Sequence, residues 1–335
     1  MNKAPAIITP ERIVESTQHM GFHGHFNVEL IHKPTGLLKR KLQFKNLITT
    51  AGLNWIGAGS GGSSGWDISF NRGSSAHTAV GTGTTTPTIG DTALVAQVFR
   101  TNSTGVPSIS PTYGFADDYS YAYVEHTRVF LPGSGSGNLT EVGIFNASSG
   151  GTMWTRQLFK DEFGAPTTII KTDDDELRIT YQLRLNILTT TQDTTQTIKS
   201  VSRDLSTRAY DIDASGRWGA TSNASCVINS IGQSWRTAGS GILYSASAMP
   251  AITATQTGTG TGNSTGSFAA YTAPERFRDG TYIWNPGLGS LDIGSVIWGN
   301  SNWGTPPIIT TINPAVNKTA SERFTFVGRF SFGSV

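Results

Sequence analysis

Residues Glu176 to Ile187 read Glu-Leu-Arg-Ile-Thr-Tyr-Gln-Leu-Arg-Leu-Asn-Ile, and this stretch decides the fold class. Its odd positions from Leu177 to Ile187 are apolar or Tyr, whereas its even positions from Arg178 to Asn186 are polar. Because successive side chains on a strand point to opposite faces, the alternation predicts a long strand with one buried and one solvated face. A helix would scatter the same apolar residues around its circumference.

The last segment of the chain repeats this alternation. Phe324, Phe326, Phe330 and Phe332 fall on one face of the segment that runs from residue 323 to residue 332. We therefore expect a second long strand there, with the rest of the chain built onto these two strands. The sequence predicts an all-β fold of antiparallel, sandwich-like architecture.

The composition agrees with this class of fold. Charged residues make up 14% of the 335 residues, against about 25% in a typical soluble domain, and there are 39 glycines. Low charge with abundant Gly, Ser, Thr and aromatic residues is typical of short strands joined by many turns. It is not typical of helical enzymes rich in Glu, Lys and Ala.

Charge and cysteine content narrow the function classes. The net charge of +2 is too small to indicate nucleic acid or an anionic membrane as a partner. Cys226 is the single cysteine, so an internal disulfide framework is excluded. The N-terminal residues lack the apolar core of a signal peptide, and no run reaches the roughly 18 apolar residues of a membrane helix. We expect folding in a cytosol and no membrane insertion.

We divide the chain into three parts. Residues 1–24 carry two prolines and few periodic apolar positions, and we expect an extended N-terminal arm that lies on a neighbouring subunit. Residues 25–190 form a β-sandwich-like domain. Residues 191–335 form a second β-rich region, either separate or packed on the first as one unit, after a polar seam at residues 189–197.

Local signals define the start of the sandwich-like domain. Alternating residues 26–30 and 38–48 flank Lys33-Pro-Thr-Gly36, which predicts a hairpin with a tight turn. Residues 49–56 predict a short helix capped by Thr49 or Thr50. Long Gly/Ser/Thr-rich loops follow, chiefly at residues 57–90 and 256–266.

The two halves of the chain resemble each other. Strand-like residues 139–145 and 152–159 precede a Lys-Thr pair and the first long strand. Strand-like residues 291–298 and 308–312 precede a second Lys-Thr pair, Lys318-Thr319, and the last strand. The identity is low, so an internal duplication is a hypothesis at this point.

Three histidines, His19, His23 and His25, form the one histidine cluster of the sequence. Two His at i and i+2 on an extended chain point the same way and could share a metal ion. Glu15 and Glu29 are the nearest further ligands, so we prefer an arm that happens to carry histidines. No cofactor is predicted.

Other candidate groups have simpler interpretations. Asp173 to Glu176 lacks the alternating spacing that wraps calcium and is better explained as a charged turn. A glycosidase needs two close carboxylates, and Glu125 with Glu141 is such a candidate pair, although both lie inside expected strands. The Gly-rich runs match neither of the two phosphate-binding patterns, because no Gly-Lys-Ser/Thr follows them and no βαβ unit surrounds them. No catalytic residues are assigned, and we expect a protein that is not an enzyme.

The C-terminal tryptophans allow two interpretations. Trp284, Trp298 and Trp303 lie in a stretch rich in Asn, Gly and Pro, where a lectin would stack sugars on them. We prefer core and interface packing, which Trp serves more often.

Several segments together resemble one class of protein. They are residues 26–56 with the ending Thr-Thr-Ala-Gly-Leu, Val80-Gly-Thr-Gly-Thr-Thr-Thr-Pro with Asp91-Thr-Ala-Leu, residues 139–145, residues 150–156 and Ile170-Lys-Thr172. Their order is similar to that in tail-fibre, tail-tip and neck-appendage proteins of tailed bacteriophages. The resemblance covers about residues 26–190.

The resemblance implies a structural subunit of the virion, in the tail, fibre or neck, that resides in the host cytoplasm before assembly. Its partners would be copies of itself, as a ring or trimer, and other tail or neck proteins. The alternative is a receptor-binding module whose loops around residues 57–90 or 256–303 recognise a host surface glycan. A third interpretation is a depolymerase acting on host polysaccharide.

Overall fold

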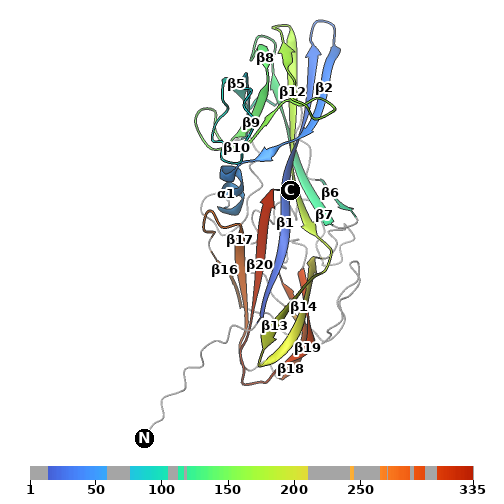
Figure 1. The fold of residues 1–335 in the computed structure, drawn as a ribbon, viewed down its shortest axis with the longest axis vertical. Helices are drawn as coiled ribbons and strands as arrows, with labels where there is room; N and C mark the ends of the chain where they lie inside the picture. The colour runs from blue at the N-terminus through green and yellow to red at the C-terminus, as the bar shows by residue number, and fades with distance from the viewer. Residues whose placement is uncertain are drawn as a thin grey trace.

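The computed structural model describes residues 14–58, 76–104, 112–116, 119–209, 242–244, 265–269, 271–286, 290–298 and 308–334. Nearly all regular structure in these ranges is β-strand, and the single helix described there is α1 (Thr50–Ala58). The prediction of an all-β fold is confirmed. The described part is elongated, and a long sheet runs along it (Figure 1).

The long sheet has eight strands, seven of them in one path. Its order is β16 (Thr265–Phe268), β17 (Phe277–Trp284), β20 (Phe324–Ser334), β1 (Val14–His32), β12 (Asp175–Leu188), β7 (Tyr119–Phe130) and β6 (Thr112–Ala116), with β2 (Leu37–Lys45) also paired to β1. Strand β1 is central in this sheet. It pairs with β12 on one side, and on its other side it pairs first with β20, along its N-terminal part, and then with β2, along its C-terminal part.

Two five-stranded sheets lie toward opposite ends of the molecule (Figure 1). The N-terminal sheet has the order β3 (Leu47–Ile48), β10 (Met153–Leu158), β9 (Glu141–Phe145), β4 (His77–Gly81) and β5 (Gln97–Thr101). The C-terminal sheet has the order β13 (Gln192–Ile198), β14 (Val201–Ala209), β19 (Ile308–Lys318), β18 (Leu291–Trp298) and β15 (Ile242–Tyr244). A small sheet pairs β8 (Gly137–Leu139) with β11 (Ile169–Lys171).

The two alternating stretches form the centre of the core, as predicted. The odd positions of β12 from Leu177 to Ile187 are buried, and their even neighbours are half-buried. On β20, Phe326 and Phe330 lie 5.5 and 4.7 Å from the ring of Trp298. Gly328 leaves room for that indole, because a Cβ there would lie 2.2 Å from an atom of the Trp298 ring. The aromatic residues of β20 therefore join the long sheet to the C-terminal sheet.

The predicted hairpin and helix near the N-terminus are also confirmed. Strands β1 and β2 pair across a turn that contains Gly36 in the left-handed region, with φ of 71°. The Thr49 hydroxyl accepts the N–H of Gly52 at 3.0 Å and caps α1. The helix packs against β10, where a Cβ on Gly52 would lie 2.3 Å from the carbonyl oxygen of Trp154.

The expectation of an arm over residues 1–24 is wrong for its described part. Residues 14–24 belong to β1 and pair with β20 and β12; residues 1–13 lie outside the described ranges. The sequence of residues 14–24 does not show the apolar and polar alternation of a strand, because the polar residues Ser16 and Gln18 occupy inward positions. Both side chains form hydrogen bonds inside the molecule: the Ser16 hydroxyl bonds with Thr207, and the Gln18 amide nitrogen donates to the carbonyl of Leu188 at 3.1 Å.

The expected division near residue 190 does not separate two sheets. Residues 192–198 form β13, and the long sheet combines strands from residues 25–190 with strands from residues 191–335. One hydrophobic core is continuous through both regions. The pairing of β1 with both β12 and β20 is the physical link between them.

The two halves repeat one arrangement of strands. Antiparallel neighbours β7 and β12 are joined in sequence through the β9–β10 hairpin, and antiparallel neighbours β17 and β20 through the β18–β19 hairpin. The first hairpin, β9–β10, is extended by the pair of strands β8 and β11, in which Lys171 pairs with Gly137. At the corresponding end of the second hairpin, β18–β19, Lys318 pairs with Leu291. The weak sequence similarity between the halves therefore falls on equivalent strands.

Candidate functional site: a polar recess on the C-terminal sheet

The outer face of the C-terminal sheet carries a grid of short polar side chains. Strands β13, β14 and β19 are neighbours, and their register sets Asp193 opposite Ser206 and Ser206 opposite Thr311. One step along, the register sets Thr195 opposite Asp204 and Asp204 opposite residue 313, an asparagine. Alternate positions on each strand thus aim at the same side of the sheet.

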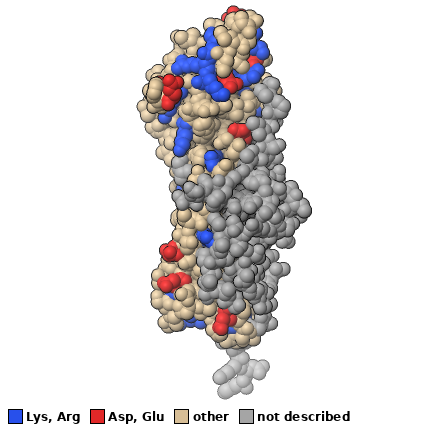
Figure 2. Space-filling model, turned by 90° about the vertical axis from the view of Figure 1, so that its right-hand side faces the viewer, with Lys and Arg blue, Asp and Glu red and all other residues tan. Residues whose placement is uncertain are grey.

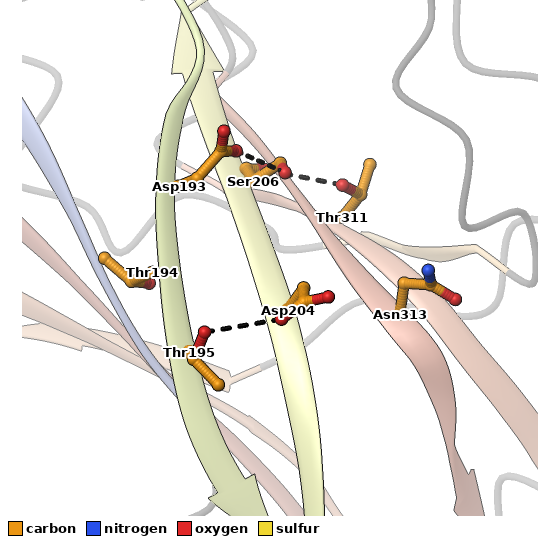
Figure 3. A pocket seen from close by; sticks show the side chains of 7 residues that line it. All are labelled: Asp193, Thr194, Thr195, Asp204, Ser206, Thr311 and Asn313. Atoms are coloured by element: carbon orange, nitrogen blue, oxygen red, sulfur yellow. Dashed lines mark hydrogen bonds between the residues drawn. The ribbon is translucent and has the colours of Figure 1, made fainter.

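These residues surround an open recess of about 470 Å³, shown in Figure 3. The lining residues share short, oxygen-bearing side chains: Asp193, Thr194, Thr195, Asp204, Ser206, Thr311 and Asn313. Both aspartates are exposed, whereas Thr311 is buried at the floor. The volume lies within the usual range of small-molecule sites, about 300 to 1,000 Å³.

Hydrogen bonds hold the two carboxylates in place. The Ser206 hydroxyl donates to Oδ1 of Asp193 at 2.5 Å, and the Thr195 hydroxyl donates to Oδ1 of Asp204 at 3.3 Å (Figure 3). The Thr311 hydroxyl donates to the backbone carbonyl of Ser206 at 3.5 Å. Each carboxylate therefore has one oxygen engaged by a neighbouring strand and further acceptor capacity toward solvent.

A two-residue turn creates this part of the site. Lys199 and Ser200 have φ of 52° and 60°, and they connect the paired residues Ile198 and Val201. Positive φ at both central residues matches the twist of a tight hairpin. Sequence reasoning missed this hairpin because Lys-Ser replaces the usual Asn-Gly signal, and because residues 189–197 show no alternation of apolar and polar residues.

The chemistry of the recess is that of hydrogen-bond recognition. Its seven described lining residues carry two carboxylates, one amide and four hydroxyl groups, and none of these seven is basic or aromatic. Such a set accepts hydrogen bonds from hydroxyl or amine groups and disfavours an anion.

The three histidines lie on one face of β1. His23 and His25 are half-buried and His19 is exposed, with its Nδ1 bonded to the Ser331 hydroxyl. Burial, followed by the nearby charge of Arg184, lowers the pKa of His23 to about 4. Burial also lowers the pKa of His25, although Glu125 acts in the opposite direction.

These surroundings do not assemble a metal site in the described part of the chain. No group of three His, Cys, Asp or Glu side chains that could hold a metal ion occurs among the described residues. The register sets His23 opposite Arg184, and His25 lies between Gln182 of β12 and Lys45 of β2. Their nearest cations oppose the binding of a further positive charge.

Glu125 and Glu141, weighed as a glycosidase pair, lie on different sheets. Glu125 on β7 accepts a hydrogen bond from Gln182 at 3.0 Å on the long sheet. Glu141 is fully buried in the N-terminal sheet, where its Oε2 bonds Nε of Arg156 at 2.9 Å. Arg156 also bonds Asp91 at 2.6 Å. Glu141 on β9 therefore acts as a buried anchor for the loop between β4 and β5, whose Gly83, Val95 and Ala96 donate their backbone N–H groups to it.

The acidic run at residues 173–176 is a charged turn, as preferred. Asp175 bonds Lys39 at 2.8 Å, and Glu176 bonds Lys33 at 3.1 Å. These lysines belong to the β1–β2 hairpin, at the end of the molecule where Figure 2 shows Lys and Arg side chains gathered. The run joins the hairpin to β12.

The preferred interpretation of the C-terminal tryptophans is confirmed for the two that are described. Trp284 and Trp298 are fully buried, and the Trp298 indole donates to the Thr310 hydroxyl at 3.0 Å. Trp303 lies outside the described residues, as do loops 59–75 and 256–264.

Comparison of the chain with models of known families, with curated proteins and with solved structures finds no match. Among the described residues, no helix has the length and apolar character needed to cross a membrane.

Proposed function

We propose that this protein is a non-enzymatic structural subunit of a tailed-bacteriophage virion, in the tail, fibre or neck apparatus, and that it assembles as a symmetric homo-oligomer. Support for this comes from the segments within residues 26–190 that resemble such proteins in their sequence and in their order along the chain. In the structure, residues 26–56 contribute the β1–β2 hairpin of the long sheet and most of α1, and residues 139–156 contribute β9 and most of β10 in the N-terminal sheet. The helix α1 packs against β10, so the two groups of segments are in contact.

The observation that carries the proposal is the length and position of β1. This strand pairs with β12 from Met20 to His32 and with β20 from Val14 to Phe22, so one continuous backbone segment connects both halves along the molecular axis (Figure 1). Pulling the two ends apart would load these strands in shear, which strains many ladder hydrogen bonds together. Resistance of this kind suits a subunit that carries force in a particle.

The edge of the N-terminal sheet supports self-association. Strand β5 lies at that edge, and its residues Gln97, Val98 and Phe99 are exposed. Val98 is 43% exposed and nearby Val95 is 57% exposed. An edge strand with exposed apolar side chains is a site of pairing with another chain unless it is covered. A symmetric oligomer would cover it.

Electron microscopy of intact phage particles labelled with an antibody to this protein tests the proposal. We expect label at one defined position on the tail or neck of every particle. Particles that contain no copy of the protein, from an infection in which the protein is made, would overturn the proposal. Mass spectrometry of purified particles provides the independent measure of copy number.

The second candidate function is recognition of a host surface glycan. The polar recess on β13, β14 and β19 favours it, because its carboxylate, amide and hydroxyl groups lie together on an exposed face. Binding of the purified protein to host surface polysaccharide is the corresponding test.

A further inference from the structure

We infer that the recess lined by Asp193, Thr195, Asp204, Ser206 and Asn313 binds a neutral, hydroxyl-rich ligand, namely a sugar unit of a glycan. The inference rests on the second candidate function and gives it a site and a ligand class. It does not depend on the protein being a virion subunit. It also moves the expected binding region, which was sought in loops, onto a sheet face.

The recess presents two carboxylates as hydrogen-bond acceptors. Asp193 and Asp204 each hold one oxygen in a hydrogen bond from a neighbouring strand, at 2.5 and 3.3 Å, and Oδ2 of each carboxylate has no partner among the described residues. Carboxylates accept hydrogen bonds from hydroxyl groups and form the stronger, charge-assisted type. Fixing the carboxylates beforehand reduces the ordering cost of binding.

The recess also presents hydrogen-bond donors, spaced by the distance between neighbouring strands. Asn313 offers an amide that both donates and accepts, and the serine and threonine hydroxyls do the same. Neighbouring strands lie about 4.8 Å apart, so β13, β14 and β19 present polar groups at regular intervals across the recess. A ligand with several hydroxyl groups on a rigid ring can bond to more than one strand at once.

The described lining of the recess disfavours other classes of ligand. Two carboxylates, with no cation among the described lining residues, disfavour anions such as phosphate or acidic sugars. The part of the lining that the structure describes has no apolar side chain larger than a threonine methyl, which disfavours apolar ligands. Calcium takes six to eight oxygens at about 2.4 Å, whereas this recess of about 470 Å³ is open and wide. A neutral polyol matches these hydrogen-bonding groups, since its hydroxyls both donate to the carboxylates and accept from the amide and hydroxyl donors.

The experiment measures binding of the full-length protein to an array of glycans that end in neutral hexoses, N-acetylhexosamines or deoxyhexoses, with matched glycans that end in a uronic acid. We expect binding to at least one neutral group and at least tenfold weaker binding to its acidic counterpart. The sugar that binds is then titrated in solution, with calcium chloride alone as a second probe.

Variants connect the binding to the recess. We expect Asp204→Asn and Asp193→Asn to weaken binding at least tenfold and Thr195→Ala several-fold. Thr197→Ala is the matched control, because Thr197 is an exposed threonine on the same strand and outside the recess. It should leave affinity unchanged. All four positions are exposed, so thermal unfolding of the variants should match that of the parent.

Three results would overturn the inference: no neutral sugar binds, the control variant weakens binding as much as Asp204→Asn does, or calcium binds and sugars do not. Failure here is distinguishable from failure of the subunit proposal. A protein found in particles that binds no sugar refutes only the recess inference, and a sugar-binding protein absent from particles refutes only the subunit proposal.

Discussion

Asp175 and Glu322 make the same hydrogen bond in two equivalent turns. Oδ2 of Asp175 accepts the backbone N–H of Thr172 at 2.9 Å, and Oε2 of Glu322 accepts the backbone N–H of Thr319 at 2.8 Å. The return bond is also repeated, since the N–H of each acidic residue donates to the carbonyl three residues earlier. Each turn leads into one of the long strands, β12 or β20, that flank β1.

The first prediction concerns the buried member of this pair. Asp175 is fully buried and bonds Lys39 at 2.8 Å, so Asp175→Asn leaves a lysine without its counter-charge. Lys39 is 35% exposed, so water partly screens this pair, and we expect the free energy of unfolding to fall by about 1 to 3 kcal/mol, mainly because the hydrogen bonds to the buried Asp175 side chain are weakened. Urea denaturation measures it. Asp174→Asn, an exposed change in the same turn, is the control and should stay within about 0.5 kcal/mol of the parent.

The second prediction concerns acid stability. Burial alone would raise the pKa of Asp175, but hydrogen bonds from Lys39 and Thr172 hold that pKa well below its usual value. Hydrogen bonds from Lys199 and Thr319 lower the pKa of Glu322 to about 2. Both groups therefore stabilise the fold above the unfolded carboxyl pKa of about 4, and this stability is lost as pH falls through the lower folded values.

We expect the parent to lose stability steadily from about pH 5 downward. The double variant Asp175→Asn with Glu322→Gln starts less stable and should show a shallower slope over the same range. Unfolding free energies from urea titrations at stepped pH give both slopes. Parallel slopes for parent and variant would show that other carboxylates govern the acid transition.

The third prediction concerns the buried pair Glu141 and Arg156. Glu141 also accepts the backbone N–H groups of Gly83, Val95 and Ala96 at 2.8 to 3.2 Å, so it holds the loop before β5 against the sheet. Glu141→Gln should cost about 3 kcal/mol or more. Many buried ion pairs can be replaced by apolar residues without loss of stability, but we expect such a replacement of Glu141 and Arg156 to destabilise the protein.

The double variant Glu141→Leu with Arg156→Met checks that statement. Its apolar side chains fill the space but leave three backbone N–H groups without an acceptor, and each costs about 1 to 3 kcal/mol. We expect no recovery of stability over Glu141→Gln in thermal or urea unfolding. Recovery to the parent value would mean that the loop does not depend on Glu141.

The fourth prediction concerns Gly52 in α1. Alanine normally stabilises a helix relative to glycine by about 1 kcal/mol. Here the added Cβ would lie 2.3 Å from the carbonyl oxygen of Trp154, a backbone atom that cannot rotate away. Gly52→Ala should therefore destabilise the protein. Gly90→Ala is the matched control, because the nearest atom to its new Cβ lies 4.0 Å away, and it should be neutral or slightly stabilising.

The fifth prediction concerns self-association through β5. Val98→Lys places a charge on the exposed edge strand without touching the core, since Val98 is already 43% exposed. We expect a smaller oligomer by sedimentation velocity, with unchanged far-UV circular dichroism. Val201→Lys, at a position 42% exposed on β14, is the control and should keep the parent's oligomeric state. If the Val98→Lys variant forms the same oligomer as the parent, β5 is not part of the interface between subunits.

Particular residues show where sequence reasoning succeeded and where it failed. The strands at residues 177–187 and 324–332 were predictable because their inward positions are uniformly apolar or aromatic. The start of β1 was missed because Ser16 and Gln18 point inward, and hydrogen bonds to groups of β14, β19 and β12 reduce the cost of burying them. The recess was missed because its residues are distant in sequence and individually ordinary.

The order of apolar and polar residues by itself determined the class of fold, the two long strands, the first hairpin and the capped helix, because each of these is a local consequence of side-chain periodicity or turn chemistry. The tertiary structure alone decided that β1 lies between β12 and β20, and that β13, β14 and β19 meet to form one polar face. The physical reason is that strand neighbours are chosen by hydrogen bonds and packing between segments far apart in the chain. No single segment carries that information.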